Sequence, residues 1–172
     1  WFEGKYESFG VLEKANGLKY EGEWYAGKYH GQGKLIEASG EIYEGNFDKG
    51  KLNGEGSWNN NGSSYSGSWV KNKYEGYGRL VLNTGEVYEG MFHNGKYNGK
   101  GTQILADGTQ ITGSFKNGKA EGICRLDSPN GDHYEGEFNN GEYEGDGQIW
   151  LNNGDYYKGI FRNGKMNKYG TY

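Results

Sequence analysis

Tyr20-Glu21-Gly22-Glu23-Trp24 is a short stretch that returns, with edits, along the whole chain. From this stretch onward a new copy begins every 22 or 23 residues. The third place is glycine in every copy and the fifth is aromatic. The copies begin at Phe2, Tyr20, Tyr43, Tyr65, Tyr88, Ile111, Tyr134 and Tyr157. A repeat this regular predicts an array whose copies pack mainly on their neighbours in sequence and present an extended surface.

Each copy has the pattern of two short strands joined by turns. Large or small residues alternate with charged ones from Tyr20 to Trp24, and this period of two is typical of a β-strand. Residues 34–37 form a second short strand, and no helical period of useful length occurs. We therefore expect an all-β fold over 1–172, an elongated, twisted, single-layer antiparallel sheet of tandem β-hairpins with an aromatic groove. Its units start near 2, 20, 43, 65, 88, 111, 134 and 157, the first shortened and the last incomplete.

The turn from one copy to the next ends in glycine. Asn-Gly and Asp-Gly are typical of two-residue hairpin turns in which both residues have positive φ. We expect such tight turns at Ser39-Gly40, Asn61-Gly62, Thr84-Gly85, Asp107-Gly108, Asn130-Gly131 and Asn153-Gly154.

The alternation also assigns the faces of the sheet. The first, third and fifth places share one face, where glycine leaves room for the rings on either side. The opposite face carries mainly glutamate. A single layer cannot cover both faces, so we expect some rings to stay accessible and to anchor a partner. The predicted partner-binding groove consists of Tyr20, Trp24, Tyr43, Phe47, Tyr65, Trp69, Tyr88, Phe92, Tyr134, Phe138, Tyr157 and Phe161.

Lysine recurs at the ninth place of the copies. The residues are Lys28, Lys51, Lys73, Lys96, Lys119 and Lys165, and Glu142 is the exception. Stacked copies would align these side chains along one rim, where they suit an acidic phospholipid surface or another acidic partner. The same lysines at turn tips also keep a sheet soluble and discourage edge association. The nearby glutamates and the negative net charge favour the solubility role.

Composition narrows the function classes. Glycine accounts for 34 of the 172 residues, and the net charge is −4, whereas nucleic-acid binders are usually basic. The single Cys124 allows no internal disulfide and stands at a place that is glycine in other copies, so we expect a small filler. It weakly favours a reducing compartment. The chain has no run of 18 apolar residues, and its ends suggest a piece of a longer protein.

No residue pattern points to catalysis, to a metal or to a cofactor. Gly31-Gln32-Gly33 is followed by no helix, which a dinucleotide-binding loop requires. The histidines His30, His93 and His133 fall at different places in their copies, so they cannot line one column. The carboxylates repeat along a face, as they do on a solvated surface. We therefore expect a protein that is not an enzyme.

The copies resemble the MORN repeat (membrane occupation and recognition nexus). The pattern of Tyr-x-Gly-x-Trp/Phe, Asn-Gly-Lys and Asn-Gly-x-Gly is met by residues 88–101, and the resemblance covers essentially the whole chain. It implies an elongated β-sheet with a groove that serves as a scaffold, with members in ciliary radial spokes, cytoskeletal complexes and membrane junctions, and beside enzyme domains.

The resemblance implies a protein partner, held as a helix or an extended peptide within a larger cytoplasmic assembly of a cilium or the cytoskeleton. Membrane tethering through the lysine rim and targeting of an enzyme domain outside this segment are the alternatives. The terminal strands have unpaired edges, which allow end-to-end or dimeric association.

Overall fold

The computed structural model describes residues 8–171, which form fifteen β-strands and no helix. The chain divides into two compact units, residues 1–83 and 84–172. The predicted first strand, at residues 2–6, lies outside the described residues.

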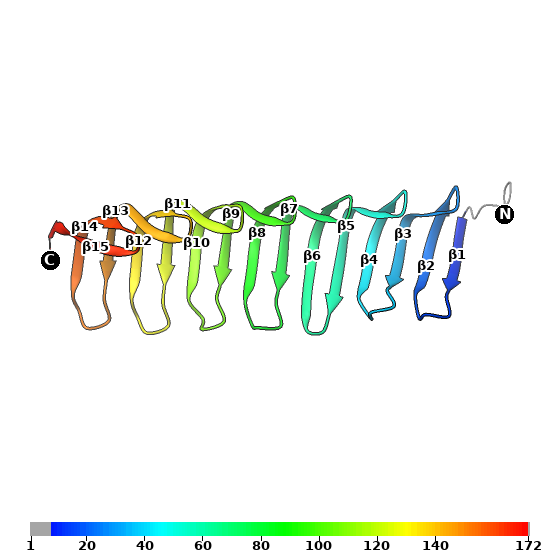
Figure 1. Ribbon diagram of the computed structural model, residues 1–172, viewed down its shortest axis with the longest axis horizontal. Coiled ribbons are helices and arrows are strands. Elements are labelled where there is room, and N and C mark those ends of the chain that lie inside the picture. The colour runs from blue at the N-terminus through cyan, green and yellow to red at the C-terminus, as the bar shows by residue number, and fades with distance from the viewer. Residues whose placement is uncertain (1–7, 172) are drawn as a thin grey trace. The chain divides into compact units, whose positions relative to one another are not determined.

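Within each unit consecutive strands pair antiparallel in chain order, as Figure 1 shows. The first unit contains β1 (Ser8–Glu13), β2 (Lys19–Tyr25), β3 (Lys28–Ile36), β4 (Ile42–Asp48), β5 (Lys51–Asn60), β6 (Ser63–Val70) and β7 (Lys73–Val81). The second contains β8 (Val87–His93), β9 (Lys96–Ile104), β10 (Gln110–Lys116), β11 (Lys119–Asp127), β12 (His133–Asn139), β13 (Glu142–Trp150), β14 (Tyr156–Arg162) and β15 (Lys165–Thr171). The all-β prediction of tandem antiparallel hairpins is confirmed.

Two kinds of turn lie at opposite ends of the strands (Figure 1). Two-residue turns with positive φ at both residues join the two strands of a copy. They are Ala26-Gly27, Lys49-Gly50 and Lys71-Asn72 in the first unit, and Asn94-Gly95, Asn117-Gly118, Asn140-Gly141 and Asn163-Gly164 in the second. They also bond between copies, since the Gly50 N–H donates to the Tyr29 carbonyl at 2.9 Å and the Gly118 N–H to the Tyr97 carbonyl at 2.9 Å.

Most turns between copies are longer than predicted. The Gly40 N–H donates to the Glu37 carbonyl at 2.9 Å and the Glu37 N–H to the Glu41 carbonyl at 2.8 Å, which closes a three-residue loop. Only the glycine of such a loop has positive φ, as in a type I turn followed by a glycine bulge. The expected two-residue geometry is therefore wrong at Ser39-Gly40, Thr84-Gly85, Asp107-Gly108, Asn130-Gly131 and Asn153-Gly154.

The expectation holds at Asn61-Gly62, where both residues have positive φ, 45° and 84°. The physical reason is the length of the copy. The copy that begins at Tyr43 has 22 residues whereas those with the longer loop have 23, so the missing residue is the third residue of the loop.

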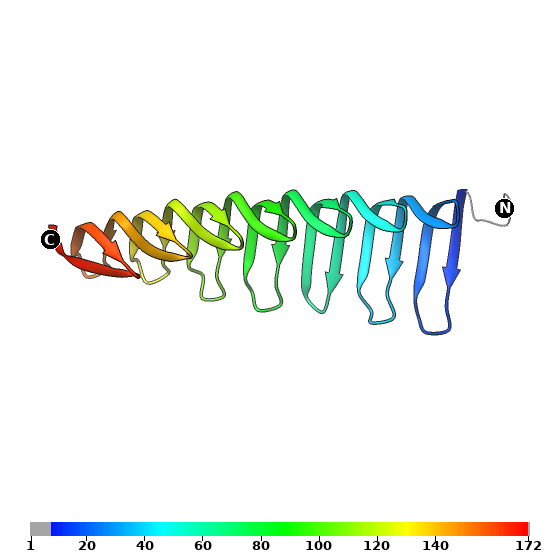
Figure 2. The ribbon, with the colours of Figure 1, turned by 45° about the horizontal axis from the view of Figure 1, so that its top comes forward.

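A β-bulge in every second strand folds the hairpin tip over one face. In β3, Gly31 and Gln32 lie between the register pairs Glu23↔His30 and Gly22↔Gly33. Gly31 takes a φ of 53°, and the Gln32 N–H donates to the Glu23 carboxylate at 3.0 Å. Bulges bend a strand and increase its twist. Figure 2 shows the strands curling over at this end, and we call the covered face the inner face.

The rings pack between the sheet and the folded tips. Tyr20 stacks on Tyr29 of the tip with ring centroids 3.8 Å apart, and it meets Trp24 and Phe47 edge-on at 5.2 and 5.4 Å. In the second unit Tyr88 stacks in the same way on Tyr97, the tyrosine at the tenth place of its own copy, with ring centroids 3.7 Å apart. Such pairs contribute about 0.5–1.5 kcal/mol each beyond their buried area, so the repeated ring cluster is the core of each unit.

The hydroxyl of the leading tyrosine bonds to carbonyls beside the bulge. Tyr20 Oη donates to the Glu23 carbonyl at 2.9 Å and lies 3.4 Å from the His30 carbonyl. Tyr88 donates to the Met91 carbonyl at 3.0 Å. Burial raises the pKa of Tyr20 and of Tyr88 to about 12, so both hydroxyls remain protonated donors at neutral pH.

Two glycines of a copy lie directly against the ring and hydroxyl of its leading tyrosine. A Cβ on Gly22 would lie 2.6 Å from Tyr20 Oη, and one on Gly33 would overlap the same hydroxyl. The interpretation that these glycines make room for rings is supported, with the ring coming from the glycine's own copy.

The copy that begins at Ile111 lacks the tyrosine and replaces its hydrogen bonds. The Cys124 Sγ–H points to the Ser114 carbonyl at 3.4 Å and the Glu121 carbonyl at 3.9 Å. These carbonyls occupy the same places in their copy as the two that Tyr20 Oη contacts. Isoleucine has no hydroxyl, so a side chain fits where other copies need glycine, and the buried Cys124 fills that space.

We predict that alanine is poorly tolerated at a glycine whose Cβ position is taken by the hydroxyl of the leading tyrosine. A Cβ on Gly78 would overlap Tyr65 Oη, whereas a Cβ on Gly56, at the same place of the preceding copy, would have its nearest neighbour at 3.0 Å. Gly78→Ala should lower the free energy of unfolding by about 2–3 kcal/mol and Gly56→Ala by less than about 1 kcal/mol, measured by urea denaturation. Equal midpoints for the two variants would show that the tyrosine does not impose the glycine.

Candidate functional site

The rings of the predicted groove form the core of each unit. Eleven of the twelve are buried, with exposed fractions between 0% for Tyr20 and 7% for Trp24. The expectation that some of these rings stay accessible is met by Tyr43 alone, and the other eleven cannot line a groove, because the folded tips cover the face that a flat sheet would leave open. Tyr43 alone is half-buried, since Leu52 and Trp69 approach the glycine beneath it.

The twelve residues therefore lie on one face, yet only Tyr43 reaches the surface. Alanine in place of Trp24, Trp69 or Phe92 would open a cavity in the core. Loss of partner binding by such a variant could not be separated from loss of folding.

A second layer of side chains covers this core and reaches solvent. It contains the residues at the tenth, sixteenth and eighteenth places of the copies, the residues that stand two positions before the start of each copy, and Tyr43. We call the half-buried residues of this layer the inner strip. In the first unit they are Leu12, Leu18, Tyr29, Glu37, Glu41, Tyr43, Trp58, Asn60, Ser63, Tyr74, Leu80 and Leu82. In the second they are Glu86, Tyr97, Gln103, Leu105, Leu126, Ser128, Asp132, Tyr143, Ile149 and Leu151.

The inner strip combines apolar groups, neutral phenols and carboxylates. Burial, and then the nearby Tyr43 and Glu41, raise the pKa of Tyr74 to about 12, and burial followed by Asp132 raises the pKa of Tyr143. These phenols therefore remain hydrogen-bond donors at neutral pH. The charged members are all acidic, and no lysine or arginine belongs to the strip in either unit.

Part of this layer can be read from the sequence. The sixteenth place of the copies is apolar at Leu35, Trp58, Leu80, Leu126 and Ile149 and is interrupted by Gln103. The tenth-place tyrosines were missed, because they belong to the inner face only after the bulge folds the tip. The recurring Gly-x-Gly after them was the available signal.

The predicted lysine rim lies on the hairpin tips. Lys28, Lys51, Lys73, Lys96, Lys119 and Lys165 each follow a two-residue turn, and all six are exposed. The register places Lys116 opposite Lys119 and Arg162 opposite Lys165, whereas Asp48 lies opposite Lys51. Positive charge is therefore denser on the tips of β10–β11 and β14–β15 than on that of β4–β5.

A charged cluster lies on the outer face of the second unit. The Arg125 guanidinium donates to the Asp127 carboxylate at 2.8 and 2.9 Å, and His133 Nδ1 lies 2.8 Å from the same carboxylate. His133 Nε2 lies 3.1 Å from Glu135. The hydrogen bonds from Arg125, helped by His133, lower the pKa of Asp127 from 3.8 to about 2.

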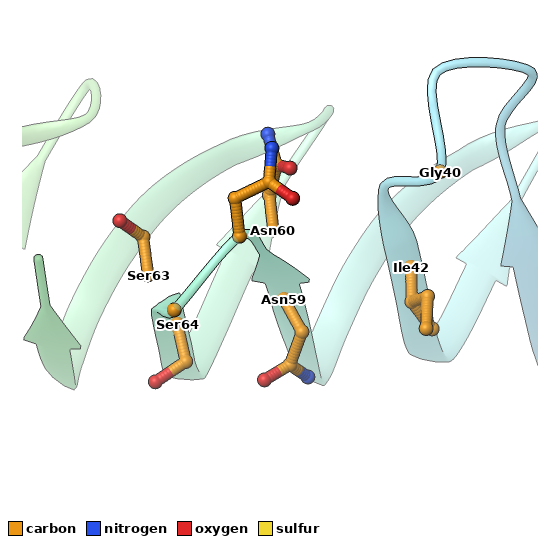
Figure 3. A pocket seen from close by; sticks show the side chains of 8 residues that line it. Gly40, Ile42, Asn59, Asn60, Ser63 and Ser64 are labelled. Carbon is orange, nitrogen blue, oxygen red and sulfur yellow. The ribbon is translucent and has the colours of Figure 1, made fainter. Parts of the chain in front are cut away.

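A shallow hollow of about 240 Å³ borders the shortened turn in the first unit (Figure 3). Figure 3 shows Ile42, Asn59 and Ser64 pointing to the same side. The missing loop residue explains the hollow, and its lining contains no ionisable group.

Within the described residues no group of three histidine, cysteine or carboxylate side chains could hold a metal ion. That part of the chain also contains no helix that could cross a membrane.

We predict that Asp127 contributes stability that acid removes. Its folded pKa is lowered from 3.8 to about 2, so the contribution is present above about pH 4 and is lost as the pH falls toward 2. Asp127→Asn should lower the melting temperature at pH 7 by no more than about 2–4 °C, because the ion pair is exposed. Between pH 4 and 2 the melting temperature of this variant should fall less than that of the wild type. Asp146→Asn, for which no ion pair is seen in the described residues, is the control, and equal acid sensitivity of wild type and Asp127→Asn would contradict this assignment.

Comparison with known proteins finds the repeat along the whole chain. The model of the MORN repeat matches residues 1–19, 20–41, 43–63, 65–87, 88–110, 112–133, 134–156 and 157–172. No curated protein matches the chain.

Two solved structures are similar at low identity. The TCP domain of SAS-4 (dCPAP) of Drosophila melanogaster, in complex with a proline-rich motif of Ana2 (dSTIL), has 13% identity and a TM-score of 0.49, over 89% of this chain and 90% of that chain. The G-box domain of the microcephaly protein CPAP has 13% identity and a TM-score of 0.43, over 89% and 93%.

The family model matches eight consecutive stretches, each with the strand and turn pattern described above. MORN repeats are non-catalytic repeat modules associated with protein or membrane interaction. The chain belongs to the MORN repeat family.

Proposed function

We propose that the chain is a non-catalytic docking module whose inner strip holds a partner protein, as a helix or an extended peptide, within a larger cytoplasmic assembly of a cilium or the cytoskeleton. The observation that carries the proposal is the inner strip itself. Its leucines, Trp58 and Ile149 are half-buried in the free chain and would be covered by a partner. Covering apolar surface is the main favourable contribution to such association.

The predicted ring columns have a supporting part in this proposal. Tyr20, Trp24 and their equivalents fix the inner strip from beneath, and Tyr43 contacts the partner directly. A rigid surface loses little conformational entropy on binding, which favours affinity.

The charges of the strip define the partner further. Carboxylates such as Glu37, Glu86 and Asp132 accompany the apolar groups, and the strip has no cation. A segment with apolar residues and lysine or arginine complements this surface, whereas an acidic segment is repelled.

Membrane tethering is a second candidate, favoured by the exposed lysines on the hairpin tips. Basic side chains near an anionic bilayer contribute about 1 kcal/mol each, so several tips acting together would be needed. The tips of β6–β7, β10–β11 and β14–β15 each carry two cations, which are Lys71 and Lys73, Lys116 and Lys119, and Arg162 and Lys165.

We predict that charge at the eighteenth place abolishes partner binding without unfolding the chain. Glu37 occupies this place in one copy, so Leu105→Glu and Leu151→Glu are compatible with the fold. In affinity purification from the native source, the double variant should recover the partner at least about fivefold less than the wild type, because two buried apolar contacts are replaced by carboxylates.

Ile123→Glu is the matched control for this experiment. Ile123 is 69% exposed on the outer face, and Glu55 stands at its place in another copy. Recovery with the control should stay within about twofold of the wild type. Undiminished recovery with the Leu105→Glu and Leu151→Glu double variant would exclude the inner strip of the second unit as the docking surface.

For the membrane candidate we predict salt-sensitive flotation with vesicles that contain phosphatidylserine. Lys96→Glu combined with Lys119→Glu should abolish it, since two tip cations are reversed, while Lys100→Glu on the outer face should not. Absence of flotation by the wild type at low salt would rule out this function.

A further inference from the structure

The outer face of the second unit has a row of rings that other copies lack. Register pairs place Asp127 on β11, His133 on β12, Trp150 on β13 and Tyr156 on β14 side by side. The His133 and Trp150 rings are 5.0 Å apart and tilted by 38°, and the Trp150 and Tyr156 rings are 5.2 Å apart and tilted by 43°.

Aliphatic, polar or charged residues occupy this row elsewhere, and none of them is aromatic. Ile36 and Ile42 stand at its places in the first unit, and Val87 and Ile104 at the start of the second. The aromatic row is therefore a property of the last copies and is not required by the repeat.

The rings that flank Trp150 are fixed by hydrogen bonds. His133 contacts Asp127 at 2.8 Å through Nδ1 and Glu135 at 3.1 Å through Nε2. Tyr156 Oη donates to Gln148 at 3.1 Å. The indole thus lies between two held rings, and its side chain is 36% exposed. A large aromatic group in a preorganised, accessible position is typical of a recognition anchor.

The charges around the row favour a cationic ligand. The outer faces of β11–β14 carry the carboxylates of Asp127, Glu135, Glu137, Glu142 and Asp146, the cations Lys119, Arg125, Lys158 and Arg162, and the titratable His133. Lys119 and Arg162 lie at the hairpin tips, at the far end of the strands from the row. The two turns that flank the row, residues 128–132 and 151–155, each contain one aspartate and no lysine or arginine. A cation held against an indole face is stabilised by the ring quadrupole, and the surrounding carboxylates attract it further.

We propose that Trp150 anchors a second docking site, whose ligand is an arginine side chain on a segment of a partner protein. The guanidinium stacks on the exposed indole, because its planar, weakly hydrated group suits an aromatic face better than an ammonium does. The site lies on the face opposite to the inner strip. It does not depend on the inner strip, and occupation of both surfaces would let the chain bridge two proteins.

The test uses a fluorescently labelled glycine-serine peptide with three arginines, and the same peptide with citrulline, which has the shape of arginine without its charge. Fluorescence anisotropy with the whole chain should show saturable binding of the arginine peptide, at least about tenfold tighter than that of the citrulline peptide. No binding of the arginine peptide, or equal binding of the two, would overturn the proposal.

Two matched tryptophan-to-leucine variants locate the site. Trp150→Leu keeps an apolar side chain where other copies have isoleucine or valine, so the sheet is preserved while the π face is lost. Trp58→Leu makes the same change on the inner strip, at a place where Leu35 and Leu80 stand in other copies. Trp150→Leu should raise the dissociation constant of the arginine peptide at least about fivefold, and Trp58→Leu should leave it within about twofold.

Unchanged affinity of Trp150→Leu, or equal weakening by both variants, assigns the peptide to another surface and overturns the proposal. Thermal unfolding of both variants should match the wild type, which separates loss of the anchor from loss of the fold. The peptide experiment also remains distinct from the inner-strip experiment, because Trp150→Leu leaves every residue of the inner strip unchanged.

Discussion

The tyrosine hydroxyl at the first place of the repeat makes the interaction on which the rest of the structure depends. It donates to a carbonyl at the bulge that folds the hairpin tip, as Tyr20 does to Glu23 and Tyr157 does to Asn167. The same bulge brings a second ring onto the tyrosine, so the hydrogen bond and the stacked pair form together. An unpaired buried carbonyl costs about 1–3 kcal/mol, which explains why a copy without tyrosine uses the Cys124 thiol instead.

This arrangement determines which side chains are available for recognition. A flat sheet would expose its rings, but the folded tips cover them and leave the next layer, the inner strip, half exposed. The strip contains no cation, whereas the exposed tip beside it carries lysine. A partner segment lying along the strip would therefore meet opposite charges at its two edges, which fixes its orientation as well as its affinity.

The strands, their order within each unit and the inner face were predictable from the sequence, because alternation and the 22- or 23-residue period depend on local residue types. The folded tip was not, since the bulge at Gly31 and Gln32 is a register shift between two strands. For the same reason the prediction placed Trp24 and Phe47 on the correct face of the sheet but did not foresee that they are buried. The ring row was missed because His133, Trp150 and Tyr156 belong to three strands and become neighbours only through pairing.

Departures from the repeat fall into two physical classes. Ile111 and Cys124 are both buried, and each fills space or supplies a bond that the missing tyrosine would have provided, so together they restore the core. Trp150 restores nothing, because isoleucine and valine serve at its place elsewhere, and yet it remains 36% exposed between held rings. A departure that the fold does not need, on a surface that the fold keeps rigid, is where recognition is expected to differ from one member of a repeat family to another.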